Sequence, residues 1–235
     1  MSSNNTTLPS YGDDDVFTSQ YTLKYTGFGF QALSIPIFKY TESTGYPADP
    51  SLETPEYTVA RVNDKLQLTS TNPKETTHTI MAYLKKQKIE TRDAPESAAG
   101  SKVLENIPVE WYSTYSQPKL YDIKLSGGKL YRWWSAGDGV FELLDKSRDT
   151  TNKDGVVARI AASKADRTVI VISITDAALE KGSELTENVV LVSAIGVLKK
   201  CEKNLVHFGW FDAGASAKSA SFMSFFNMAG LSGSG

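Results

Sequence analysis

Residues 183–203 read SELTENVVLVSAIGVLKKCEK, and this stretch decides the fold. Ser183 or Thr186 can cap a helix here, and the glutamates at the beginning and the lysines at the end suit the helix dipole. The positions between them are apolar nearly all round the helix: Val189, Val190, Leu191, Val192, Ala194, Ile195, Val197 and Leu198. A helix without a polar face belongs in the interior of a protein.

The chain before this helix is dominated by strand patterns. Alternating or β-branched segments between turn residues predict strands at 21–25, 35–40, 57–62, 65–69, 77–84, 109–112, 120–125, 129–134, 140–144, 156–160 and 168–174. Asn63-Asp64 and Gly127-Gly128 mark hairpin turns. Pro36 suggests an edge strand, and residues 41–55 and 90–106 are predicted to be loops. The segment 168–174 is apolar on both faces, which predicts that both faces are covered.

Many strands followed by one apolar helix predict a mainly β fold, because a sandwich of two sheets would have no need of such a helix. We expect a closed antiparallel β-barrel wrapped around the helix. Three segments are predicted: a disordered polar leader at 1–16, the barrel domain at 17–204, and an aromatic, Gly/Ser-rich tail at 205–235. The 235 residues suffice to bury a substantial core.

Net charge, cysteine content and the length of apolar stretches argue against several classes of protein. The net charge of −2 and the pI of about 5.8 do not indicate a nucleic-acid-binding surface. Cys201 is the only cysteine, so an internal disulfide is excluded and a reducing compartment is favoured. The N-terminus shows no secretory signal, and no apolar stretch reaches the ~20 residues that span a bilayer. We therefore expect a cytoplasmic protein.

The segment from Tyr131 to Lys203 has an order of elements that resembles a known family. An aromatic strand (Tyr131-Arg132-Trp133-Trp134), three apolar strands and the apolar helix follow one another. This order resembles the second half of tubby-like C-terminal domains, especially a small fungal tubby-like group of unknown function. It is more remotely similar to the LURP-one-related and scramblase families. The resemblance covers about a third of the chain, and residues 17–125 fit only as a generic set of strands.

The resemblance implies a twelve-strand barrel and a binding role, often at membranes. Tubby domains bind phosphoinositides through basic side chains on one face, but those side chains do not map residue by residue onto this sequence. The tail and the segments 41–56 and 89–106 exceed a minimal domain of this type.

Residues for catalysis or metal binding are sparse. His78, His207 and Cys201 are too few and too scattered for a zinc-type site, which needs three or four converging ligands. A Cys201–His207 nucleophilic pair is conceivable, but a cysteine at the end of an apolar helix usually packs as a small hydrophobe. Gly27-x-Gly29 lacks the third glycine of a dinucleotide loop, and 149–155 has the wrong acidic spacing for calcium. We predict no catalytic residue, no metal and no cofactor.

Two features could bind a partner. Lys85, Lys86 and Lys88 follow an apolar strand and could form a site for phosphate or lipid headgroups, although a solvated strand end is the simpler interpretation. The second feature is aromatic. Trp133 and Trp134 must point to opposite faces of one strand, and Phe222, Phe225 and Phe226 in the tail could contact a neighbouring subunit.

Three hypotheses remain open. The first is a non-catalytic binding or scaffold domain of tubby-like type, peripheral at membranes, whose partner is an anionic lipid headgroup or a protein. The second is a self-assembling homo-oligomer that uses the Phe-rich tail. The third is an enzyme that uses two carboxylates about 5–10 Å apart, a separation that sequence cannot reveal.

Overall fold

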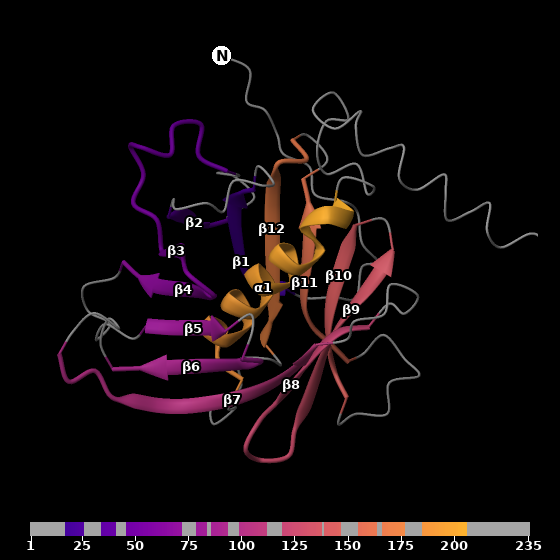
Figure 1. The fold of residues 1–235 in the computed structure, drawn as a ribbon. Coiled ribbons are helices and arrows are strands. Elements are labelled where there is room, and N and C mark those ends of the chain that lie inside the picture. The colour runs from indigo at the N-terminus through magenta and orange to yellow at the C-terminus, as the bar shows by residue number, and fades with distance from the viewer. Residues whose placement is uncertain are drawn as a thin grey trace, which may run out of the picture.

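The chain folds into a closed β-barrel of twelve antiparallel strands with a helix inside it (Figure 1). The computed structural model describes residues 17–25, 34–40, 46–71, 79–83, 86–93, 99–111, 119–137, 139–146, 155–163, 166–176 and 185–205. The expected mainly β fold, a closed barrel around one apolar helix, is therefore confirmed. The proposed leader at 1–16 and nearly all of the tail at 205–235 lie outside the described residues.

Each strand pairs with its neighbours in sequence, and β1 pairs with β12 to close the barrel. The strands are β1 (Phe17–Lys24), β2 (Ile35–Lys39), β3 (Tyr57–Val62), β4 (Lys65–Ser70), β5 (Thr79–Tyr83), β6 (Lys88–Arg92), β7 (Val103–Trp111), β8 (Lys119–Lys124), β9 (Leu130–Gly137), β10 (Val140–Asp145), β11 (Val156–Ala162) and β12 (Val169–Thr175). The helix α1 spans Glu187–Leu205.

This up-and-down order gives the barrel two distinct rims. Connections that follow even-numbered strands lie at one rim, and connections that follow odd-numbered strands lie at the other. We call the first the start rim, because α1 follows β12 and begins there, and the second the finish rim. The second half of α1 approaches the β5–β6 hairpin, because Gly196 lines a small cavity together with Tyr83 and Lys88.

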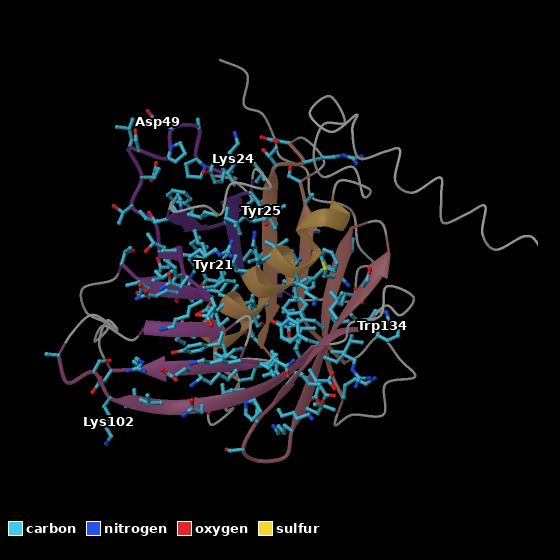
Figure 2. All side chains as sticks on the ribbon, viewed as in Figure 1. Tyr21, Lys24, Tyr25, Asp49, Lys102 and Trp134 are labelled. Carbon is cyan, nitrogen blue, oxygen red and sulfur yellow. The ribbon has the colours of Figure 1, made fainter. Side chains whose placement is uncertain are left out.

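Alternation along the strands separates the barrel core from its outer face. Tyr21 and Leu23 on β1 point inward and are buried, whereas Lys24 is exposed at the finish rim (Figure 2). Asn63 adopts a φ of 55° and forms the predicted turn between β3 and β4. All seven residues of β12 are buried, which confirms that both of its faces are covered.

The prediction of a polar loop at 90–106 is wrong. The segment contains the end of β6 and the beginning of β7, so the connection shrinks to 93–102. In β6, only Ile89 belongs to the apolar core, so the strand has little hydrophobic periodicity of its own. It is held by ladders to β5 and β7, which are tertiary contacts that a local pattern cannot reveal.

Pro36 also departs from expectation, because β2 is not an edge strand. The ladder between β1 and β2 extends only from Lys39 to Ile37 on β2, so Pro36 lies beyond it and pairs with Thr58 of β3. A proline is tolerated there because the missing amide proton is not needed by β1.

The helix α1 fills the barrel and is capped as expected. The amide of Val189 donates to Oγ1 of Thr186 at 3.4 Å, so Thr186 is the cap, and Ser183 lies outside the described residues. Every residue from Val189 to Leu198 is buried. Among the described residues there is no helix long and apolar enough to cross a bilayer.

A few polar groups fix the rotation of α1 inside this apolar interior. Trp133 Nε1 donates to Oγ of Ser193 at 3.0 Å, and that hydroxyl donates to the carbonyl of Val190 at 2.8 Å. The hydroxyl of Tyr121 donates to the carbonyl of Ser193, and that of Tyr21 donates to Glu187. Buried polar groups are costly unless paired, so these bonds favour one orientation of the helix.

Candidate functional site

A row of residues crosses the outer face of β3–β7 close to the finish rim. The residues are paired in register from strand to strand: Val62, Lys65, Tyr83, Lys88 and Pro108. Their chain neighbours Leu66, Ala82 and Ile89 belong to the barrel core, so the row itself faces outward. We call it the Tyr83 row.

Three lysines converge on the ring of Tyr83. Their Nζ atoms lie 5.1 Å (Lys65), 5.5 Å (Lys86) and 4.6 Å (Lys88) from the ring centre. Ammonium groups at this distance are attracted by the ring quadrupole. Lys86 stands in the turn between β5 and β6, where Gln87 has a φ of 52°. The ring itself is only 5 % exposed, so it serves as a platform on which the lysines gather.

The carboxylate of Glu90 lies beneath this cluster. Glu90 is 2 % exposed and accepts bonds of 2.6 Å from Lys88 and from Nε of Arg92. The hydroxyl of Tyr83 donates to it at 3.3 Å. Burial alone would raise the pKa of Glu90, but the hydrogen bonds from Lys88 and Arg92 outweigh that effect and lower its pKa below the usual value.

Four basic side chains and one carboxylate make the contacts described around the ring. Lys65, Lys86, Lys88 and Arg92 bring four positive charges, and Glu90 brings one negative charge. Lys24, at the end of β1, and Arg167, on the β11–β12 connection, also belong to the finish rim. Lys86 is exposed and Lys65 and Lys88 are partly exposed, and an ammonium group that reaches solvent can donate to phosphate or carboxylate oxygens.

The structure brings together some of the predicted site residues and leaves others untested. Lys86 and Lys88 lie on the same ring, whereas Lys85, Phe222, Phe225 and Phe226 lie outside the described residues. Lys65 and Arg92 were not singled out from the sequence. The signal for Lys65 was present: it opens the return strand of the predicted 57–69 hairpin and precedes the inward residue Leu66.

The adjacent tryptophans occupy opposite faces, as expected. Trp133 is 0 % exposed and bonded to Ser193. Trp134 is only partly buried and lies on the outer side of β9, away from α1 (Figure 2).

Other reactive groups in the described part of the chain are buried or paired. Burial raises the pKa of the Cys201 thiol to about 12, so it carries no thiolate at neutral pH. The buried carboxylate of Asp122 lies 2.6 Å from Nε of Arg132. No group of three or more His, Cys, Asp or Glu within the described ranges could hold a metal ion, while His78 and His207 fall outside those ranges. The carboxylate enzyme stays a hypothesis.

The Glu90 ion pairs predict a specific acid sensitivity. Because the pKa of Glu90 is lowered in the folded protein, its contribution is complete above the pKa of an unfolded glutamate, about 4.3. The contribution is lost as the pH falls through the lower pKa of the folded state. We expect the difference in unfolding free energy between the wild type and Glu90→Gln to shrink as the pH falls through this range.

Urea unfolding at a series of pH values measures this difference. Glu53→Gln, at an exposed position on the β2–β3 connection, is the control and should show a much weaker pH dependence. A wild-type-to-Glu90→Gln difference that stays constant from neutral to acidic pH would contradict the assigned role of Glu90.

Comparison of the chain with family models, with curated proteins and with solved structures gives no match in any of the three.

Proposed function

We propose that this chain is a non-catalytic binding domain that takes a phosphate-bearing anionic ligand on the Tyr83 row. The observation that carries the proposal is the convergence of three lysine ammonium groups within 5.5 Å of one tyrosine ring. Ammonium groups gathered on one ring can together donate to a single anion, which their positive charges attract. Glu90 is already engaged by Lys88 and Arg92, so it offsets only part of the charge.

The headgroup of an anionic phospholipid is the ligand that this surface fits best. Val62 is 41 % exposed in register beside Lys65, so a small apolar contact adjoins the basic cluster. Each basic residue near an anionic membrane surface contributes about 1 kcal/mol. The proposal also extends to the resemblance to tubby-like domains, which bind phosphoinositides and for which a barrel around one helix is the expected architecture. The proposed location is the cytoplasmic face of a membrane.

Co-sedimentation with liposomes tests the proposal. We expect the full chain to bind vesicles that contain phosphoinositides, to bind neutral phosphatidylcholine vesicles weakly, and to dissociate at high salt. The triple variant Lys65→Glu, Lys86→Glu, Lys88→Glu should lose this binding. The matched control changes three exposed lysines near the start rim to glutamate, Lys39, Lys102 and Lys129, so that its net charge is identical. It should keep most of the binding.

Two outcomes would reject the lipid proposal. The first is a wild-type chain that ignores anionic vesicles. The second is equal loss of binding in the two triple variants. That result would mean that binding depends on the net charge of the protein and not on the lysines around Tyr83. Competition by a soluble inositol phosphate separates recognition of the phosphate group from recognition of the membrane surface, because only the former is displaced at modest concentration.

A further inference from the structure

The most exposed large apolar side chain in the described part of the molecule is Leu52, at 81 %. It lies on the β2–β3 connection at the start rim. Exposed leucines scattered singly need no explanation, but Leu52 is held in an ordered turn. Its amide donates to the carbonyl of Asp49 at 3.2 Å, and the amide of Ser51 donates to Oδ1 of Asp49 at 3.0 Å.

The ends of this connection are tied to the barrel. Tyr46 packs edge-on against Phe38 of β2, with the ring centres 5.7 Å apart. Thr71 Oγ1 donates to the carbonyl of Glu56 at 3.0 Å. The turn that carries Leu52 therefore rises from an anchored base, and Asp49 of this turn lies at the periphery of the molecule in Figure 2.

The chain segment that carries Leu52 is acidic. Residues 46–56 contain Asp49, Glu53 and Glu56 and no lysine or arginine, and Asp49 and Glu53 are exposed. Hydrogen bonds from Ser51 lower the pKa of Asp49, so its charge persists at neutral pH. A partner for this turn must offer an apolar contact ringed by positive charge.

The opposite rim of the same molecule has that chemistry. The Tyr83 row contains Val62, which is 41 % exposed, together with Lys65 and Lys88, and Lys86 of the adjoining turn lies over the same ring. Strand order places the row near the finish rim, whereas the connection that carries Leu52 joins β2 to β3 at the start rim. An apolar residue among acids at one end and an apolar residue among lysines at the other are complementary in charge and in polarity.

We propose that a second copy of this chain docks its Leu52 turn on the Tyr83 row, with Leu52 against Val62 and with Asp49 and Glu53 facing Lys65 and Lys86. The two surfaces belong to opposite rims, so a docked copy still has either its own Leu52 turn or its own Tyr83 row open to a further copy. The contact is heterologous and builds a head-to-tail chain. One turn on one row buries little area, so the association is weak and depends on concentration and salt.

Sedimentation equilibrium of the full chain over a concentration series tests this contact. We expect the average mass to rise with concentration at low salt and to return to the monomer mass at high salt. The variant Leu52→Ser, Glu53→Lys should remain monomeric over the same series. Leu104→Ser removes a second exposed leucine, 49 % exposed on β7, and should associate like the wild type.

A mixing experiment identifies the two surfaces. Glu53→Lys puts a positive charge on the turn, and Lys86→Glu puts a negative charge on the row, so each variant alone should associate less than the wild type. In a mixture, the Leu52 turn of the Glu53→Lys variant carries a positive charge and can dock beside the negative charge of the Lys86→Glu variant. The average mass of the mixture should therefore rise above that of either variant alone.

Three results would overturn the contact. They are a monomeric wild type at every concentration, unchanged association of the Leu52→Ser, Glu53→Lys variant, and association that disappears only when residues 206–235 are removed. The contact does not rest on the proposed ligand. Failure of vesicle binding with association intact rejects the ligand alone, and monomeric behaviour with vesicle binding intact rejects the contact alone.

Discussion

Replacing Val192 by Asp is expected to unfold the domain. Val192 is 0 % exposed in the middle of α1, where the helix is enclosed by the barrel. A carboxylate at this position loses its hydration among apolar side chains, which costs at least several kcal/mol. A domain of this kind is stable by about 5–15 kcal/mol in total. Circular dichroism and amide proton dispersion should therefore report an unfolded or aggregated chain.

A matched control puts the same charge on the same helix. Thr186 is exposed and caps α1, and aspartate is also a good cap, so Thr186→Asp should fold normally. Ile195→Val removes one methylene from a position that is 0 % exposed and should cost about 0.5–1.5 kcal/mol. A Val192→Asp protein with a wild-type unfolding transition would show that α1 is not enclosed by the barrel.

Trp133→Ala is expected to lower the unfolding free energy by about 3–5 kcal/mol. The side chain is fully buried and donates to Ser193 of α1 at 3.0 Å, so the change removes a large apolar volume and leaves a buried hydroxyl with one partner fewer. Trp134→Ala removes the same atoms from the outer face of the same strand and should cost about 1 kcal/mol or less. Urea denaturation of both variants measures the difference.

Trp133→Ala and Trp134→Ala remove the same atoms from adjacent positions of β9. Any difference in their unfolding free energies therefore reports the face of the strand on which each tryptophan lies. Equal losses would mean that Trp134 is also part of the core and that the assignment of faces along β9 is wrong. Trp133→Phe, which keeps most of the ring but has no donor, should fall between the wild type and Trp133→Ala. The difference between Trp133→Phe and the wild type measures the bond to Ser193 together with the smaller ring.

Two segments that are apolar on every side could be interpreted correctly without coordinates. A run of apolar residues on every side of a helix has only one physical solution, enclosure, and Val189–Leu198 is such a run. The apolar, β-branched segment at β12 likewise indicates a strand covered on both faces. In both cases the hydrophobic effect acts on local composition, so the local pattern carries the information.

The sequence predicted only part of the candidate site, because the residues of the site come from separate hairpins. Lys86 and Lys88 were singled out as neighbours in sequence, but Lys65 joins them only through the register between β4 and β5. Glu90 and Arg92 fell in a segment interpreted as loop, since β6 has little apolar periodicity. The complementarity of Leu52 and Val62 also depends on which rim each one occupies.

By itself, the sequence determined that this chain is a mainly β protein closed around an apolar helix, because burial of apolar surface is dictated by residue type and period. Only the tertiary structure decided which charges meet. Strand register places Lys65, Lys86 and Lys88 on one tyrosine ring and the Leu52 turn at the other rim. Charged groups act through distance, and distances between hairpins exist only once the barrel has closed.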